Sequence, residues 1–205
     1  MPLVTALKHQ RRNPDRCNVY IDQAFACAIP LLELSSQGLF VGRELSEVEV
    51  EQLALAAERG RLFQQAVGYV GLRRRSWREV LDYLQRRGAD EVEAANIVER
   101  MQQSGLVNDL EFGRAWVADR RLLRPRSRRQ LEQELQRKGL SRDTIEQVLG
   151  EVSGDDQDEA LRQVIAKRRR VGRSDPQALM QYLLRQGFGC DQIKRLLKEE
   201  DESGM

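Results

Sequence analysis

The chain has 205 residues, of which 40% are hydrophobic and 32% are charged, and its formal net charge is +2. A chain of this length can bury a core without disulfides or metal ions, and its composition excludes a membrane protein and a disordered one. Three cysteines without a Cys-x-x-Cys spacing and a single histidine offer little to metal ligation or to cysteine–histidine catalysis. We therefore expect no metal and no cofactor.

The sequence also predicts where the protein acts. Its longest uncharged stretch, residues 23–32, is far shorter than the roughly 20 apolar residues that a spanning helix needs. No signal-like apolar run follows the basic residues Lys8, Arg11 and Arg12. We expect a cytoplasmic protein that does not bind membranes.

Residues 1–60 are predicted to form a small α+β head. Strand-like segments at 3–7, 19–21 and 24–29 are separated by turn-forming residues, which is typical of a small antiparallel sheet. The three cysteines, two in these apolar segments and one beside a glycine turn, are interpreted as small packing residues rather than reactive thiols. They are Cys17, Cys27 and Cys190.

Two helices should complete this head. A short helix at 31–37 should stop at Gly38, because glycine favours the end of a helix. Ser46 and Glu49 form a Ser-x-x-Glu capping box, which opens a helix running toward Gly60.

After residue 60 the strand pattern gives way to a repeat. Segments 76–88, 127–139 and 175–187 align without gaps, and each begins with a helix-capping residue and stops at a glycine. Each has a leucine four residues before its glycine and another apolar residue about one turn earlier, which predicts one buried stripe per helix. The caps are Ser76 with Glu79, Ser127 with Gln130, and Asp175 followed by Pro176.

Each repeated helix has a neighbour on either side. Beyond each glycine, apolar residues recur at i, i+3 and i+4, and a further helix is predicted before each cap, at 62–72, 109–122 and 158–171. The unit is therefore three helices, and the glycines lie 51 and 48 residues apart, unlike tetratricopeptide or ankyrin repeats.

The predicted fold is mainly α, with three tandem three-helix repeats that form an elongated curved rod behind the small sheet-bearing head. Such a rod offers long faces and no deep pocket. The expected domains are the head at 1–60 and the repeats at 61–105, 106–154 and 155–205, the last ending in an acidic tail.

The small net charge conceals a strong segregation of charge. Segments 61–88, 114–138 and 160–187 carry net charges of +5, +6 and +6, and acidic stretches between them restore the balance. The densest basic clusters fall at the same place in each repeat, between its first and second helices. Because the arginine fork binds phosphate and carboxylate well, these clusters predict a row of anion contacts. They are Arg73, Arg74, Arg75, Arg120, Arg121, Arg124, Arg126, Arg128, Arg129, Lys167, Arg168, Arg169, Arg170 and Arg173.

Aromatic and catalytic patterns narrow the function. Aromatic residues make up only 5% of the chain, and Trp77, Tyr83 and Trp116 are interpreted as core residues rather than base-stacking platforms. A helix-turn-helix at 135–149 stays open as an alternative, although any three-helix repeat produces that pattern. Neither a phosphate-binding loop nor a hydrolase or metalloprotease motif occurs, so we expect no catalytic residues and no enzyme.

Three segments, 104–112, 126–140 and 184–193, share a pattern with one known family, and the shared pattern covers about residues 62–198. On these segments the chain resembles the RecX family of bacterial regulatory proteins, and the middle repeat carries the most specific part of the resemblance. The sheet-bearing head is similar to that of the longer members of the family. The chain departs from the family pattern in two places: Leu123, Arg124 and Pro125 stand where a glycine-rich turn is common, and Gly113 stands where alanine is usual. These departures predict a stiffer joint and a weaker helix.

The resemblance implies a modulator, most often an inhibitor, of the RecA recombinase. Members of the family bind within the groove of the RecA–DNA filament, and they thereby affect homologous recombination, DNA repair and the SOS response. The basic clusters would then contact the filament surface or the DNA phosphates. We expect a monomer. A helix-turn-helix DNA-binding regulator and a helical scaffold unrelated to RecA remain alternatives.

Overall fold

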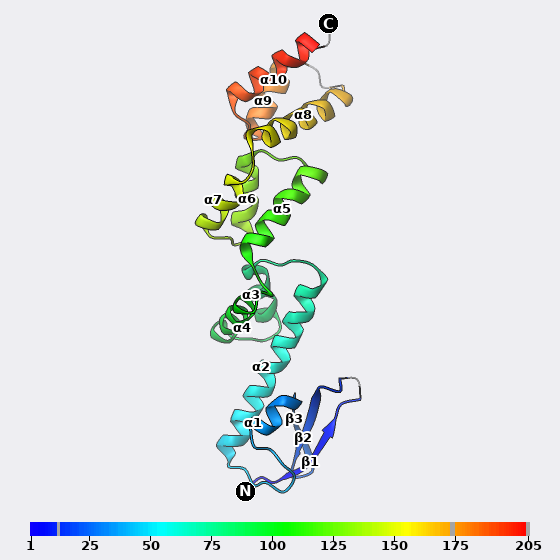
Figure 1. The fold of residues 1–205 in the computed structure, drawn as a ribbon, viewed down its shortest axis with the longest axis vertical. Helices are drawn as coiled ribbons and strands as arrows, with labels where there is room; N and C mark the ends of the chain where they lie inside the picture. Colours follow the sequence, from blue (N-terminus) through cyan, green and yellow to red (C-terminus); the bar gives the residue numbers. More distant parts are fainter. Residues whose placement is uncertain (12, 173–174, 204–205) are drawn as a thin grey trace. The chain divides into compact units, whose positions relative to one another are not determined.

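The computed structural model describes residues 1–11, 13–172 and 175–203, and it is mainly helical with one small sheet (Figure 1). It divides into two compact units. One comprises Met1–Arg73 with Leu81–Met101, and the other comprises Arg74–Val80 with Gln102–Met205. The mainly helical fold with an N-terminal antiparallel sheet is the one predicted from the sequence.

The head is built on a three-stranded antiparallel sheet in the order β1-β2-β3. Asp22 and Gln23 adopt positive φ angles of 48° and 69°, as a two-residue hairpin between β2 and β3 requires. The buried face of the sheet packs against Leu53 and Ala57 of α2, the long helix that begins at Glu47, and together they form one apolar cluster. The strands are β1 (Val4–His9), β2 (Arg16–Ile21) and β3 (Ala24–Pro30).

The cysteines divide into two kinds. Cys17 and Cys27 are buried in the sheet, and burial raises the pKa of both thiols, that of Cys27 to about 11. Their predicted packing role is confirmed. For Cys190 that prediction is wrong, because its side chain is exposed. Cys190 is the first residue of its helix and precedes the buried stripe, which begins at Ile193.

Helices α1 (Leu31–Ser36) and α2 (Glu47–Leu72) follow the sheet. The capping box of Ser46 and Glu49 is confirmed, but the expected end of α2 near Gly60 is wrong, because the helix continues to Leu72. An interior glycine costs about 1 kcal/mol relative to alanine. Burial on both sides of Gly60 outweighs this cost: Leu53 and Ala57 before it, and Leu62 and Ala66 after it.

The first repeat continues with α3 (Trp77–Arg86) and α4 (Glu91–Gln103). Tyr69 of α2 stacks on Tyr83 of α3 with the ring centroids 4.1 Å apart. The expected stripe on α4 is confirmed, because Ala94, Ile97 and Val98 are buried.

The middle repeat comprises α5 (Asp109–Leu123), α6 (Arg128–Arg137) and α7 (Arg142–Gly150), which close their own apolar core. Gly113 lies where α5 meets α7. A Cβ atom at this position would lie only 2.8 Å from Cγ2 of Val148 and 3.1 Å from Cδ2 of Leu140. Glycine therefore gives α5 a close approach to α7, and this compensates for its low helix propensity.

The third repeat comprises α8 (Gly154–Arg170), α9 (Pro176–Arg185) and α10 (Cys190–Ser203), again around a separate core. The predicted start of α8 at residue 158 is wrong by one turn. Ser153 and Asp156 form a capping box that starts the helix at Gly154. The sequence conceals this start, because aspartate replaces the usual Glu or Gln of the box and glycine is a poor helix former.

The predicted glycine ends are confirmed. Gly88, Gly139 and Gly187 have φ angles of 99°, 82° and 85°, in the left-handed region that side chains with a Cβ rarely adopt. The caps of α6 and α9 are confirmed as well, at Ser127 and at Asp175.

The second unit contains two junctions between repeats, and both have the same plan. The start of α3 meets the end of α6 at the first junction, and the start of α6 meets the end of α9 at the second. At the first junction, Oγ of Ser76 donates to the carbonyl of Lys138 at 2.7 Å. At the second, Oγ of Ser127 donates to the carbonyl of Gln186 at 2.6 Å. Both serines are buried, and each also accepts a hydrogen bond from an amide in the first turn of its own helix. A capping serine therefore fixes two helices at once.

At each junction a second hydrogen bond runs from the backbone amide of the residue after the serine to a side-chain oxygen of the next repeat. The amide of Trp77 donates to Oδ1 of Asp109 at 2.7 Å, and the amide of Arg128 donates to Oε1 of Gln157 at 2.9 Å. These first-turn amides have no partner within their own helices, because an α-helix leaves its first four N–H groups free. Each is satisfied by a side chain at the start of the next repeat.

The terminal glycines also serve these junctions. A Cβ atom at Gly139 would lie 2.4 Å from Cβ of Arg78, and one at Gly187 would lie 3.0 Å from Cβ of Arg129. Each of these arginines stands two residues after the capping serine. The glycines are thus required for close packing between repeats as well as for their positive φ angles.

Candidate partner-binding site

The joint of the middle repeat places two arginines beside the end of a helix. Helix α5 ends at Leu123, with Arg124 at its C-cap, and α6 begins after Ser127. Pro125 lies between them and cannot donate the amide that would continue a helix. Arg124 is exposed, whereas the Arg126 side chain is 33% exposed.

The last turn of α8 supplies the cations of the third repeat. It carries Lys167, Arg168, Arg169 and Arg170, which stabilise the negative end of the helix dipole. The guanidinium of Arg168 lies over the ring of Tyr182 on α9, 3.4 Å from its centroid. Arg168 is therefore held against α9.

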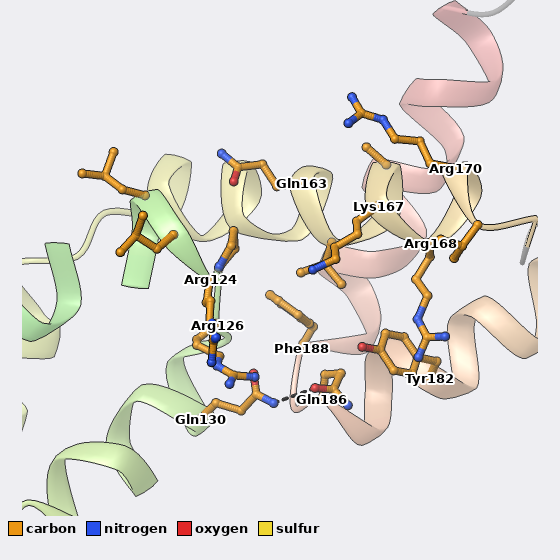
Figure 2. Close-up of a pocket in the computed structure, with 16 residues that line it drawn as sticks. Arg124, Arg126, Gln130, Gln163, Lys167, Arg168, Arg170, Tyr182, Gln186 and Phe188 are labelled. Atoms are coloured by element: carbon orange, nitrogen blue, oxygen red, sulfur yellow. Dashed lines mark hydrogen bonds between the residues drawn. The ribbon is translucent and has the colours of Figure 1, made fainter. Parts of the chain in front are cut away.

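The α5–α6 joint and the last turns of α8 line one groove, which has a cavity volume of about 860 Å³. The sequence predicted long faces without a deep pocket, so this groove was not expected. Figure 2 shows Lys167 reaching from α8 toward the space beside Arg124 and Arg126, whereas Arg170 points away from it. Among the described residues that line the groove, none is acidic. Its five cations are Arg124, Arg126, Lys167, Arg168 and Arg170. At close range these positive charges reinforce one another, so the groove favours an anionic occupant.

Neutral side chains join the two repeats within the groove. Nε2 of Gln130 donates to Oε1 of Gln186 at 2.7 Å, the hydrogen bond drawn in Figure 2. Phe188 is buried against the core of the third repeat. The groove thus rests on a well-packed base that belongs to the second junction.

An internal ion-pair cluster neutralises part of the middle basic cluster. Arg120 and Arg126 contact the carboxylate of Glu134 at 2.6 and 3.2 Å, and Nε1 of Trp116 donates to it at 2.8 Å. Burial raises the pKa of Glu134, but the hydrogen bonds from Arg120 and Trp116 and the two positive charges outweigh burial and lower the pKa overall. Arg121 forms an ion pair with Asp156. Arg120, Arg121 and Arg126 therefore have acidic partners within the chain.

Two further predicted contact residues have structural roles. Nη1 of Arg128 donates to the carbonyl of Leu149 at 2.6 Å. The aliphatic part of Arg129 packs against Gly187 at the second junction. Neither arginine lines the groove.

The first basic cluster is not part of the groove. Arg73 and Arg74 are exposed and Arg75 is half-buried in the link between α2 and α3. Arg169 is exposed on α8 but does not line the groove either. Arg173 lies outside the described residues.

Sequence reasoning missed the neutral and apolar residues of the groove. Leu122, Leu123 and Val171 line it and are 81%, 76% and 65% exposed. Tyr182 was missed as well.

The aromatic residues interpreted as core are only half-buried. Trp116 packs on Phe112 with the ring centroids 5.8 Å apart, and Arg120 and Lys138 lie over its ring at 4.1 and 4.7 Å. The ring of Trp116 is thus held by contacts within the middle repeat. Trp77 and Tyr83 are half-buried as well.

Within the described ranges there is no group of three or more His, Cys, Asp or Glu side chains that could hold a metal ion. No helix of the described chain combines the length and the apolar character needed to cross a membrane.

The fold and the groove define a class of protein: a chain with a small sheet-bearing head at its N-terminal end, followed in sequence by helical repeats, and with a cationic surface groove suited to an anionic partner. Comparison with known families gives two matches. Residues 2–46 match the regulatory protein RecX N-terminal domain, and residues 108–149 match the RecX second three-helix domain.

Relatives along the whole chain agree with these matches. A regulatory protein RecX from Bacillus pumilus is 32% identical over 97% of this chain and 78% of its own length. One from Geobacillus is 30% identical over 98% of this chain and 78% of its own length. The chain belongs to the RecX family of regulatory proteins.

Two crystal structures share the fold. A regulatory protein RecX superposes with a TM-score of 0.83 over 97% of this chain and all of its own, at 19% identity. RecX from Lactobacillus salivarius superposes with a TM-score of 0.63 over 70% of this chain and 96% of its own, at 21% identity.

Proposed function

We propose that this protein modulates the RecA recombinase by binding in the groove of the RecA–DNA filament and lowering RecA activity. It would thereby restrain homologous recombination, DNA repair and the SOS response in the cytoplasm, acting as a monomer and without catalysis. Membership of the RecX family of regulatory proteins supports this proposal, because the resemblance to that family implies a regulator of RecA.

The observation that carries the proposal is the convergence of two basic joints on one groove, whose lining has no carboxylate in the part of the chain that the structure describes. A filament offers a repeating array of acidic side chains and phosphates, and a concentrated cationic site binds such an array through charge complementarity. Of the contacts predicted from sequence, we propose Arg124, Lys167 and Arg168 as those that meet the filament, because Arg126 is paired with Glu134 and Arg170 points away from the groove.

The helix-turn-helix alternative has less support. In that interpretation α7 would enter the major groove of DNA, but its exposed surface carries Asp143 and Glu146. Its exposed Arg142 is already paired with Glu146 at 2.9 Å. Acidic side chains on a recognition helix would repel the negatively charged phosphates of DNA.

The test is the ATPase activity of RecA on single-stranded DNA, measured with this protein at a low molar ratio to RecA. We expect the rate to fall, and an unchanged rate would contradict the proposal. The double variant Arg124→Glu/Lys167→Glu should need about tenfold more protein for the same effect, because it reverses two groove charges.

A matched control separates the groove from net charge. Arg137 and Lys194 are exposed, do not line the groove and have no ion pair in the described part of the chain. Arg137→Glu/Lys194→Glu makes the same change in net charge and should act like the wild type.

A further inference from the structure

The groove combines positive charge with exposed aliphatic side chains. Leu122, Leu123 and Val171 lie beside the five cations and are mostly open to solvent. A site that bound only phosphate would gain nothing from adjacent exposed leucines. An exposed apolar patch rimmed by polar residues is instead typical of a surface that binds another protein.

The aromatic residues of the groove are poorly placed to bind nucleic acid bases. One face of the Tyr182 ring is covered by Arg168, and Phe188 is 5% exposed. The described lining residues include no other aromatic side chain. A single-stranded nucleic acid binds through aromatic platforms beside its backbone contacts, and this groove does not offer them.

We propose that the groove binds a peptide segment of a protein partner that carries both carboxylates and aliphatic side chains. The inference rests on the proposed function and deepens it, because it assigns this groove to the protein component of the filament rather than to DNA.

The arrangement of the lining explains how such a segment would bind. Arg124 and Lys167 reach the groove from two different repeats, so carboxylates on both sides of a peptide can be paired at once (Figure 2). The leucines at the end of α5 and Val171 at the end of α8 would bury the aliphatic side chains between those pairs. Charge complementarity would set the rate of association, and apolar burial would slow dissociation.

The experiment uses the full-length protein and fluorescence anisotropy. The probe is a labelled short peptide in which glutamates surround two leucines, so that it offers both carboxylates and aliphatic side chains to the groove. A second peptide has serines in place of the leucines, and oligothymidylate of equal charge represents nucleic acid.

We expect the leucine peptide to bind at least about tenfold more tightly than the serine peptide or oligothymidylate. Leu122→Ser/Leu123→Ser should weaken the leucine peptide about tenfold and leave oligothymidylate unchanged, whereas Arg124→Glu/Lys167→Glu should weaken both. Circular dichroism and the urea midpoint check that each variant is folded. Oligothymidylate that binds as tightly as the leucine peptide, or a leucine peptide that fails to bind, would overturn the inference.

The RecA ATPase assay, read together with peptide binding, distinguishes this inference from the proposed function. If the wild type leaves RecA ATPase unchanged, the proposed function fails, whereas binding of the leucine peptide still supports an acidic-peptide site. If the wild type lowers the ATPase but Leu122→Ser/Leu123→Ser acts equally well, the inference fails and the proposed function stands.

Discussion

The two repeat junctions of the second unit share their geometry but differ in their chemistry. In each, a buried serine donates to the terminal carbonyl of the next capped helix, and an arginine packs on a glycine. The side chains around this common plan differ. At the first junction Nζ of Lys138 contacts Oε1 of Glu79 at 2.6 Å, whereas at the second Gln130 and Gln186 form a neutral hydrogen bond at 2.7 Å.

These pairs occupy equivalent positions. Glu79 and Gln130 each stand three residues after their serine, and Lys138 and Gln186 each precede their glycine. The comparison teaches that repeat stacking depends on the small residues, serine and glycine, whereas the outer pair can be charged or neutral. The neutral pair lies beside the cationic groove, where an additional carboxylate would compete with an anionic partner.

The largest expected effect comes from adding a methyl group at the glycines. Gly139→Ala should lower the free energy of unfolding by about 3 kcal/mol, because a positive φ costs about 1–2 kcal/mol and the clash with Arg78 adds a similar amount. Gly187→Ala should cost less, since its closest contacts are 3.0 Å. Gly88→Ala is the control, with open space around its Cβ and only the backbone cost. Equal urea unfolding energies for all three variants would refute a packing role.

The next effect concerns the serines. Ser76→Ala and Ser127→Ala should each cost about 2 kcal/mol, because each removes a helix cap and leaves a carbonyl of the neighbouring repeat without its hydroxyl partner. Ser141 is exposed and caps only its own helix, so Ser141→Ala should cost about 1 kcal/mol or less. Denaturant unfolding measures all three, and a Ser141 variant as unstable as the others would show that capping alone accounts for the effect.

A smaller effect is expected from exchanging the outer side-chain pairs of the two junctions, Glu79–Lys138 and Gln130–Gln186. Glu79→Gln/Lys138→Gln should lose about 1 kcal/mol at low salt and little at high salt, because screening already weakens a partly exposed ion pair. Gln130→Glu/Gln186→Lys should transfer this salt dependence to the second junction. The measurement is the unfolding energy against ionic strength. Parallel salt dependences for the wild type and both double variants would mean that the pair contributes no electrostatic stability.

The smallest expected effect is a pH dependence confined to the first junction. Burial raises the pKa of Asp109, although the hydrogen bond from the Trp77 amide lowers it in part. The folded pKa lies above the unfolded one, so the contribution of this group to stability is largest below the unfolded pKa and falls as pH rises through the folded pKa. The Asp109→Asn variant should not show this decrease in the free energy of unfolding with rising pH. The decrease that Asp109 causes in the wild type should be less than about 1 kcal/mol.

Urea unfolding between about pH 3 and 6 measures this slope, a window that spans the ordinary pKa of aspartate. Gln157→Glu, at the equivalent position of the second junction, should introduce a slope there. An unchanged slope in the Asn variant would contradict the assignment to Asp109.

Local patterns predicted much of the fold. The capping residues and the positive-φ glycines were predicted from sequence, because capping and left-handed geometry depend on a few adjacent residues. The same local reasoning failed at Gly60 and at the start of α8. There, burial against distant residues and an unusual Asp156 cap outweighed propensity.

The candidate site was predicted only in part. The basic clusters are visible in the sequence, but Arg120 and Arg121 are paired with acids that stand 14 and 35 residues further along the chain. Which cations remain available to a partner therefore depends on contacts between helices. The apolar part of the groove could not be assigned either, because exposed leucines and core leucines look alike in a short helical pattern.

The sequence by itself determined the helical repeats, their caps and their glycine ends, since these follow from the periodicity and stereochemistry of neighbouring residues. Only the tertiary structure decided that Ser76 and Ser127 join repeats, and that Arg124 and Lys167 face one groove. The physical reason is distance along the chain: these arrangements join residues 43 to 62 positions apart, so they form only when separately folded helices pack together.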